Sequence, residues 1–256
     1  MMELALVQSL IASQVWLTRR LDRFLPQDFQ IDGNRDFIDN LVPQYLTANA
    51  VVYDVGGGKN PIIGGESKRR LGLKVVGLDI DAGELRAAPE GLYDEVVCAD
   101  VGHYRGGADA DLVICQALLE HVPDTGRALC ALASILKPGG RALIFVPCRN
   151  AVYARLNLAL PHDLKCRLLY GIFPEMRRDH GFPAYYDRCT PARLERLARK
   201  HGLVRERRRL YFQSNYFRFC FPLYAVWRAW MLFFRSLAGA EAAETFSVVL
   251  RKEPHE

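Results

Sequence analysis

The sequence lacks long hydrophobic runs, internal repeats and low-complexity stretches. Its longest uninterrupted apolar run, residues 219–227, is nine residues long and is followed by Arg228. A membrane-spanning helix needs about 20 apolar residues, so a polytopic membrane protein is excluded. Half of the 256 residues are hydrophobic and a quarter are charged, which is ordinary for a globular protein and excludes disordered and collagen-like classes.

Paired cysteines are also missing. The seven cysteines are odd in number and widely spaced, and no two form a CxxC pair. This argues against a disulfide framework and against a structural zinc site, so we expect no metal and a reducing compartment. The N-terminus has Glu3 where a secretory signal would be basic, and Arg19 and Arg20 follow the apolar residues. We therefore expect a cytoplasmic protein.

What the sequence does contain is an alternation of short apolar runs and helix-length spacers. Runs this apolar are typical of parallel strands that are buried on both faces. Two further strands complete the pattern near the C-terminus. The expected strands are 50–55, 74–78, 95–99, 111–115, 141–146, 203–212 and 244–251. The pattern predicts an α/β fold, doubly wound around a mostly parallel sheet.

Apolar periodicity and stop signals predict four helices outside the aromatic stretch described below. The first is an amphipathic helix that ends near Pro26. The second is expected over 36–46. The third, 125–136, is ended by the sequence LKPGG. The fourth, 190–202, begins with Thr190 as N-cap and Pro191 in its first turn. We divide the chain into an N-terminal helical extension, 1–48, and a main domain, 49–256.

Charge is unevenly distributed. Residues 1–148 contain 14 Lys and Arg against 19 Asp and Glu, whereas residues 149–210 contain 15 against 6. This basic stretch is either a solvated surface or the site of an anionic partner, and charge alone does not favour one over the other.

A glycine-rich turn gives the sharpest local signal. In VVYDVGGGKNP, a buried strand runs into Asp54 and then into Gly56, Gly57 and Gly58. Glycines at a strand end allow a tight turn and a close approach of the backbone to a ligand. The second strand ends at Asp79, where a carboxylate can accept hydrogen bonds from ribose hydroxyls. The third strand ends at Asp100, where a carboxylate can accept a hydrogen bond from an adenine amino group.

This ordered set, together with CQALLEHVPD and LKPGG, resembles the class I S-adenosylmethionine (SAM)-dependent methyltransferases, in particular the type-11 branch that includes quinone-ring methyltransferases. The resemblance covers about residues 45–150. It implies a Rossmann-like methyltransferase fold with a seven-stranded sheet, and SAM as cofactor. One departure is Asn60, where the family often has a third glycine. An NAD site is not expected, since Pro61 replaces the last glycine of G-x-G-x-x-G.

The resemblance also implies roles for individual residues. The loop beside the methionine moiety would be Asp54 and Gly56–Gly58, and Asp79 would hold the ribose. The remaining contacts would come from Ile80 beside the adenine, Asp100 and Val101 at the adenine edge, and Gln116 at the methyl-transfer chamber.

Methyl transfer to oxygen benefits from a base that takes the proton of the acceptor. The candidates are His121, His162, His180 and Asp187. His121 lies in EHVPD, where the family's histidine is often structural. The other two histidines lie in the irregular segment in which the family usually inserts substrate-binding elements.

An aromatic-rich stretch, 211–237, separates the last two expected strands and includes a helix over 223–237. It fits a core or dimer-interface helix, an interfacial membrane helix, or an RNA-binding surface. In the membrane alternative, Trp227, Trp230, Phe233 and Phe234 would enter the headgroup boundary. The arginines of the stretch, Arg218, Arg228 and Arg235, favour an exposed helix, because an unpaired buried charge is costly.

The second half, with Tyr185–Tyr186 and the aromatic stretch, also resembles methyltransferases encoded with bacterial surface-polysaccharide enzymes. That resemblance implies a hydroxyl on a membrane-proximal, lipid-linked glycan as acceptor, with a substrate cap from 148–190 and 211–240 and peripheral contact with the inner, anionic membrane face. The alternatives are a quinone or other small molecule, an RNA acceptor, and a non-catalytic SAM-binding partner protein. Nucleic acid is not favoured, because no RNA-binding module is appended, and a homodimer is left open.

Overall fold

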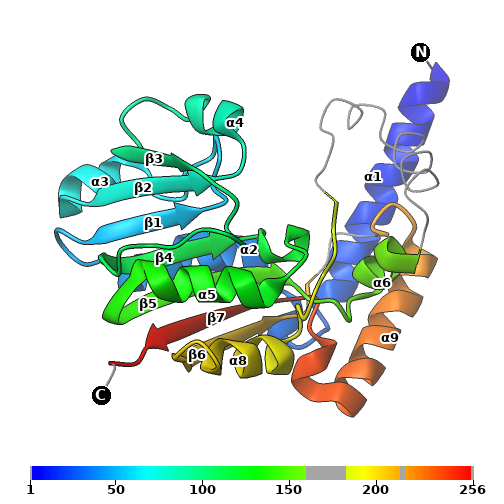
Figure 1. Cartoon of the computed structure of the whole chain (residues 1–256). Coiled ribbons are helices and arrows are strands. Elements are labelled where there is room, and N and C mark those ends of the chain that lie inside the picture. The colour runs from blue at the N-terminus through cyan, green and yellow to red at the C-terminus, as the bar shows by residue number, and fades with distance from the viewer. Residues whose placement is uncertain (1, 160–182, 214–216, 255–256) are drawn as a thin grey trace.

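The computed structural model describes residues 2–159, 183–213 and 217–254. Its centre is a seven-stranded sheet with the order β3-β2-β1-β4-β5-β7-β6 (Figure 1). This is the doubly wound arrangement that the sequence predicts. The strands are β1 Val51–Val55, β2 Lys74–Asp79, β3 Glu95–Cys98, β4 Ala110–Gln116, β5 Leu136–Pro147, β6 Leu203–Tyr211 and β7 Thr245–Lys252.

The first five strands in the sheet order are parallel, and β1 lies between β2 and β4. Tyr53 of β1 is in register with Val76 on one side and with Val113 on the other. The order in which strands are added reverses at β1, because β2 and β3 lie on one side of it and β4 and β5 on the other. In open α/β sheets ligands bind at such a switch point, beyond the carboxyl ends of the strands. The glycine-rich loop follows β1 at this position.

Strand β7 is antiparallel to both β5 and β6. Strand β5 begins earlier than expected. Leu136 is fully buried and is in register with Ala110, so the LKPGG sequence belongs to the strand instead of forming a separate turn. The register shifts between Ala110 and Leu112, and Gly139 takes a φ of +81° within this irregularity.

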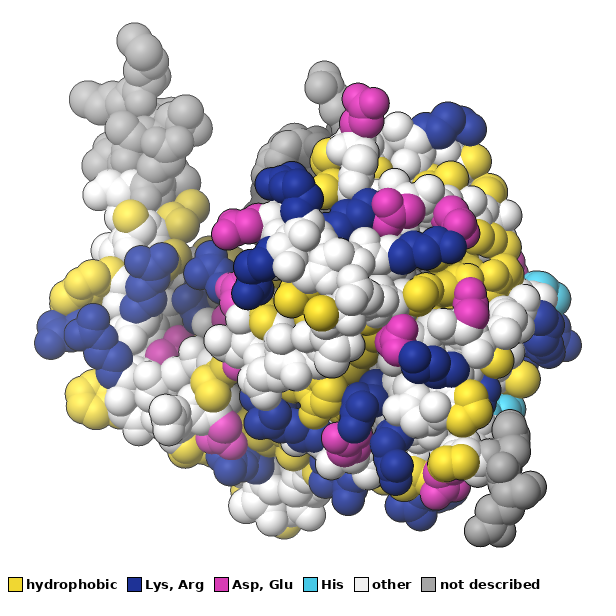
Figure 2. All heavy atoms as spheres, turned by 90° about the vertical axis from the view of Figure 1, so that its left-hand side faces the viewer, with side chains coloured by type: hydrophobic (Ala, Val, Ile, Leu, Met, Phe, Trp, Pro, Cys, Tyr) yellow, Lys and Arg dark blue, Asp and Glu magenta, His cyan; other side chains and the backbone are white. Residues whose placement is uncertain are grey.

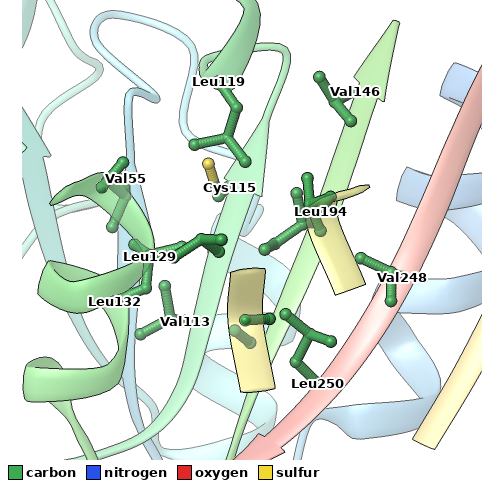
Figure 3. Packing of buried hydrophobic residues seen from close by; sticks show 14 of the residues in the cluster. Val55, Val113, Cys115, Leu119, Leu129, Leu132, Val146, Leu194, Val248 and Leu250 are labelled. Carbon is green, nitrogen blue, oxygen red and sulfur yellow. The ribbon is translucent and has the colours of Figure 1, made fainter. Parts of the chain in front are cut away.

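Helices cover both faces of the sheet (Figure 1). On one face α5 packs with α8, and Leu129 and Leu132 of α5 lie opposite Val113 of β4 (Figure 3). On the other face Phe37 and Leu41 of the N-terminal extension pack against β1 and β4. The helices of the main domain are α3 Gly65–Leu71, α4 Ala82–Arg86, α5 Thr125–Ile135, α6 Val152–Ala159, α8 Pro191–Arg199 and α9 Phe221–Ala238, with 3-10 turns η4 Leu119–His121 and η6 Gly239–Ala242.

The N-terminal extension is helical along most of its length. Helix α1 ends at Asp22, before Pro26 as expected. The range 36–46 is helical but is not one regular α-helix. The elements are α1 Met2–Asp22, η1 Gln27–Phe29, α2 Gly33–Arg35, a π-helical turn η2 Asp36–Leu41 and a 3-10 turn η3 Val42–Tyr45.

The aromatic stretch forms α9, which packs beside α1. Tyr224, Trp227 and Met231 of α9 form a buried cluster with Phe29 and Phe212. Phe29 and Phe212 stack with ring centroids 4.9 Å apart. One of the three alternatives for this stretch, a core helix, therefore describes its inner face, and Trp227 is buried instead of lying at a headgroup boundary.

The expectation that the arginines of this stretch lie at the surface is wrong for Arg228, which is 1% exposed. Its guanidinium donates to the carbonyl oxygens of Phe212 at 2.6 Å and Phe29 at 2.8 Å, and lies 3.3 Å from Asp22. Its Nε has no hydrogen-bond partner among the described residues, but the charge and both terminal nitrogens are partnered, and a buried arginine is tolerated under these conditions.

The other two arginines are paired as well. Arg218 lies 3.3 Å from Asp22, and Arg235 lies 2.8 Å from Asp28. The hydroxyl of Tyr224 also donates to Asp22, at 2.7 Å. Two acids of the N-terminal extension thus hold three arginines of the aromatic stretch, which ties the two segments together.

Part of the basic character of residues 149–210 is used within the fold, at strand β6. Arg205 and Arg208 of the edge strand β6 both pair with Glu195, at 3.0 and 3.1 Å. Arg209 pairs with Asp36 at 2.6 Å. Charged side chains on an edge strand also discourage pairing with a foreign strand. These pairs weaken the case for an anionic partner at β6.

None of the helices that the structure describes is both long enough and apolar enough to cross a membrane.

Candidate functional site

The glycine-rich loop begins directly after β1. Gly56 has a φ of +80° and Gly58 a φ of +49°, so both positions need the left-handed conformation that glycine adopts freely. The backbone N–H of Gly56 donates to the carbonyl of Leu78 at 2.7 Å, which holds the loop against β2. A Cβ on Gly57 would lie 2.6 Å from Asp54 Oδ2 and from the Tyr93 hydroxyl. The loop is therefore closely packed against the acid that precedes it.

Asp54 is fully buried at the end of β1. Its Oδ2 accepts the backbone N–H of Ile62 at 2.8 Å, and the Tyr93 hydroxyl lies 3.4 Å away. Its Oδ1 has no hydrogen-bond partner among the residues that the structure describes. Burial raises the pKa of Asp54 to about 6, and the nearby Asp79 carboxylate adds to the rise. A buried, unpartnered carboxylate oxygen is costly, so it marks a place where a cationic ligand group would be stabilised.

Asp79 ends β2 beside the same loop. Its Oδ1 accepts the backbone N–H of Asp81 at 2.9 Å. Its Oδ2 lies only 3.4 Å from the position that a Cβ on Gly58 would take. Ile80, the next residue, is 58% exposed, so its side chain is accessible to a ligand.

Asp100 follows β3 at the same edge of the sheet. Its Oδ1 accepts the N–H of Gly102 at 2.7 Å, and its Oδ2 lies 3.0 Å from Nδ1 of His103. Both oxygens are thus engaged once, and each retains a second lone pair for a further donor. Val101 is 6% exposed and belongs to the main core cluster.

Gln116 ends β4 and contacts the N-terminal extension. Its Nε2 donates to the side-chain oxygen of Asn34 in α2. The side chain of Asp32 caps α2 by accepting the N–H groups of Asn34 and Arg35. Sequence analysis did not single out Asn34, because its contact with Gln116 joins positions 82 residues apart and leaves no local signal.

His121 lies at the end of η4. Its Nδ1 is 3.0 Å from the carbonyl oxygen of Pro183, and its Nε2 is 3.9 Å from Oε1 of Glu120. Because a carbonyl oxygen can only accept, this contact assigns the proton to Nδ1 and leaves Nε2 as an acceptor in the neutral ring. Glu120 is 4% exposed, and burial raises its pKa to about 7.

The other candidate bases stand apart from this arrangement. Oδ2 of Asp187 accepts the backbone N–H of Thr125 at 3.1 Å, in the first turn of α5, which gives Asp187 a structural role. His162 and His180, and with them much of the expected cap 148–190, lie outside the described residues. Among the described residues no group of three or more His, Cys, Asp or Glu side chains could hold a metal ion.

Tyr93 is a site residue that sequence analysis missed. Its hydroxyl lies 3.2 Å from the carbonyl oxygen of Gly58 and 3.4 Å from Asp54. Its ring occupies the space beside Gly77, where a Cβ would come within 2.8 Å. A glycine inside a buried strand often marks such a close approach, so Gly77 in VVGLD was the available signal.

Comparison with known proteins covers the part of the chain that holds this loop and its acids. Residues 53–144, which run from β1 into β5 and contain the loop and all three acids, match the family described as a methyltransferase domain. Residues 53–144 thus form a methyltransferase domain within this chain, and the fold is the one found in SAM-dependent methyltransferases. SAM is the methyl donor that this family and fold imply. The unpartnered Oδ1 of Asp54 and the close glycine loop fit that donor, because its ammonium group needs a carboxylate and its methionine moiety needs a narrow cradle.

Curated relatives of the methyltransferase domain include ubiquinone biosynthesis O-methyltransferases. The protein from Cupriavidus pinatubonensis is 30% identical over 164 residues, which cover 61% of this chain and 61% of that protein. The one from Thiobacillus denitrificans is 31% identical over 167 residues, covering 62% and 66%. The chain thus spans slightly less than two thirds of the length of these relatives.

Solved structures share the fold at low identity. A SAM-dependent methyltransferase from Methanosarcina mazei matches with a TM-score of 0.54 and 18% identity, covering 84% of this chain and 98% of that one. A cyclopropane synthase from Mycobacterium tuberculosis matches with a TM-score of 0.53 and 16% identity, covering 89% and 95%. Because these proteins differ in reaction, the fold alone does not identify an acceptor.

Proposed function

We propose that the chain transfers a methyl group from SAM to a hydroxyl oxygen of a small, quinone-like aromatic acceptor. The observation that carries the donor half of this proposal is the buried Asp54, whose Oδ1 lacks a partner in the described part of the chain, directly before the glycine loop. The acceptor half is supported by the relatives, which are named as ubiquinone biosynthesis O-methyltransferases.

In this proposal the carboxyl edge of the sheet holds the donor. Asp54 accepts a hydrogen bond from the ammonium group of the methyl donor, and Asp79 accepts hydrogen bonds from its ribose hydroxyls. The loop Gly56–Gly58 cradles the methionine moiety and Ile80 flanks the adenine. Asp100 and Val101 lie at the adenine edge, where Asp100 accepts a hydrogen bond from the adenine amino group through its remaining lone pair. SAM supplies an already activated methyl group, so the protein mainly aligns the two reactants.

The acceptor would lie near Gln116. We propose His121 as the group that takes the proton of the acceptor hydroxyl, because its Nδ1 is held by the Pro183 carbonyl and its Nε2 can therefore accept. The half-exposed position of this ring, with 32% of its side chain accessible, allows the proton to pass to water.

The relatives support a quinone-like acceptor over the lipid-linked glycan that the second half of the sequence suggested. The RNA alternative loses support, because the three arginines of the aromatic stretch are paired with Asp22 and Asp28 instead of being available to a nucleic acid.

Donor binding is tested by the rise in melting temperature with S-adenosylhomocysteine. A ligand at 100 times its Kd stabilises by about 2.7 kcal/mol. Asp79→Ala should remove most of this rise, whereas Asp39→Ala, at an exposed position of the extension, should keep it. An unchanged rise in Asp79→Ala would contradict the donor site.

Methyl transfer is tested with methyl-labelled SAM and a set of hydroxylated quinones and catechols. We expect label in an ether product, and slower transfer in His121→Ala at an unchanged donor affinity. Donor binding with label in none of the quinones, glycans, lipids or RNA of a host extract would instead indicate a non-catalytic SAM-binding protein.

A further inference from the structure

The outer face of α9 is solvent-exposed and has no charged side chain. Val226, Trp230, Phe233 and Leu237 recur every three or four residues, so they lie on one face of the helix. Their side chains are 68%, 48%, 55% and 69% exposed. The remaining exposed residues of the helix are Pro222, Leu223, Ala229, Leu232 and Ser236. Contiguous exposed apolar surface of this kind marks an interaction site.

The neighbouring helix α1 carries exposed charge of one sign. The three α1 arginines are Arg19 and Arg20 in its last turn and Arg23 directly after its end. All three are exposed, whereas Asp22, the acid among them, is buried. The guanidinium of Arg20 lies 4.8 Å from the ring centre of Trp16, itself 54% exposed. Figure 2 shows this N-terminal helix standing out from the body of the molecule, with hydrophobic and basic side chains along its described part.

The two helices form one unit. They run in the same direction, since Gln14, past the middle of α1, contacts Phe221 at the start of α9, and Asp22 at the end of α1 pairs with Arg228 farther along α9. The arginines of α9 and of the segment before it are used in holding this unit together. Cations for an external partner therefore come from α1.

We propose that this α1–α9 surface, made of Val226, Trp230, Phe233 and Leu237 with Arg19, Arg20 and Arg23, binds the interface of an anionic phospholipid bilayer. Helix α9 lies in the plane of the membrane with its apolar face at the boundary between headgroups and acyl chains, and the α1 arginines contact the phosphate groups. An amphipathic helix that is too polar to span a bilayer binds in this way, and tryptophan is enriched at the same depth.

A second copy of the chain is the competing occupant. A symmetric dimer brings a surface against itself, so its basic cluster would need an acidic counterpart within the same surface. The exposed faces of α1, from residue 9 onward, and of α9 carry no acid. Anionic lipid supplies the missing negative charge, and this favours the membrane.

The test is flotation of the purified chain with vesicles of phosphatidylcholine, alone or mixed with phosphatidylglycerol. It needs neither donor nor acceptor, so its result is independent of the proposed methyl transfer. The apolar variant is Trp230→Ser with Phe233→Ser, and its matched control is Val96→Ser, which is 56% exposed on the far edge strand β3. We expect roughly tenfold or greater loss of vesicle affinity in the apolar variant and no loss in the control.

The basic variant replaces Arg19, Arg20 and Arg23 with Gln, and its control replaces the exposed Arg69, Arg70 and Arg86. Each α1 arginine removed should weaken binding to the mixed vesicles about fivefold, and added salt should have a similar effect on the wild type. Binding to phosphatidylcholine alone should change little. Circular dichroism melts check that each variant is folded.

Three results would overturn the proposal. The first is that the wild-type chain does not float with anionic vesicles at low salt. The second is that the apolar variant floats as well as its control. The third is a dimer in sedimentation velocity that the apolar variant converts to monomers while neither form binds vesicles. That result would assign the surface to a second copy of the chain.

Discussion

Asp54→Asn should weaken donor binding while leaving the ligand-free protein as stable as before or more stable. The wild-type carboxylate is fully buried, and burial raises its pKa from 3.8 to about 6. A raised pKa of an acid means that its ionised form destabilises the fold above that pH, and that this cost disappears as the pH falls toward 4. Asparagine has the same shape without the charge.

The size of the effect follows from the same shift. A difference of about two pKa units corresponds to about 3 kcal/mol at neutral pH. The new amide nitrogen would be buried without an acceptor, which costs about 1–3 kcal/mol. The ligand-free variant should therefore gain between about 0 and 2 kcal/mol. Donor binding loses a charge-assisted hydrogen bond, about 1.5–3 kcal/mol, so the Kd for S-adenosylhomocysteine should rise about 10- to 150-fold.

Urea denaturation at pH 7.5 measures the first quantity, and isothermal titration calorimetry measures the second. The opposite signs make the prediction sharp, because a substitution that merely damages the fold would lower both stability and affinity. A marked loss of stability in the ligand-free variant would refute the assignment of Asp54 as an uncompensated buried charge. An unchanged Kd would refute its role in binding the donor.

Three further predictions use the same kinds of measurement. Affinity for S-adenosylhomocysteine should fall as the pH drops below about 6, by up to about tenfold per pH unit, because Asp54 must be ionised to hold the ammonium group. Titration calorimetry between pH 5 and 8 measures this affinity, and a flat profile would contradict the prediction. Gly57→Ala should abolish the thermal shift with that ligand, since its Cβ would lie 2.6 Å from Asp54 Oδ2. Arg228→Met should cost about 3–5 kcal/mol in urea denaturation, because it removes one of the cations that face the buried Asp22 and leaves the carbonyls of Phe29 and Phe212 without this donor. Arg235→Gln, at a partly exposed pair, should cost at most about 1 kcal/mol.

The sheet could be predicted from the sequence because its signals are local. Each strand is a short run of apolar residues between turn signals, and the acids Asp54, Asp79 and Asp100 stand at strand ends that a parallel sheet brings to one edge. The same reasoning failed at LKPGG. Proline and glycines normally stop an element, but the burial of Leu136 and its pairing with Ala110 keep the chain in the sheet.

Contacts between distant segments could not be predicted. An arginine without partners is more stable in water than in the core, so the sequence alone predicts an exposed Arg228. Its actual partners are the side chain of Asp22 and the carbonyl oxygens of Phe29 and Phe212. No period or motif links a position in α9 to one about 200 residues earlier. Tyr93 was missed for a similar reason, because only the folded sheet brings it beside Asp54.

These distant contacts bear on where acceptor specificity resides. Proteins of this fold carry out different reactions, so the donor-binding edge of the sheet does not choose the acceptor. In this chain the extension reaches that edge through Asn34, which contacts Gln116. The same extension is fixed to α9 through Asp22 and Asp28. The segment that lies over the proposed acceptor position is therefore continuous with the proposed membrane-binding surface. An acceptor with an apolar tail would fit this arrangement, because the bilayer that α9 is proposed to bind would also hold the tail.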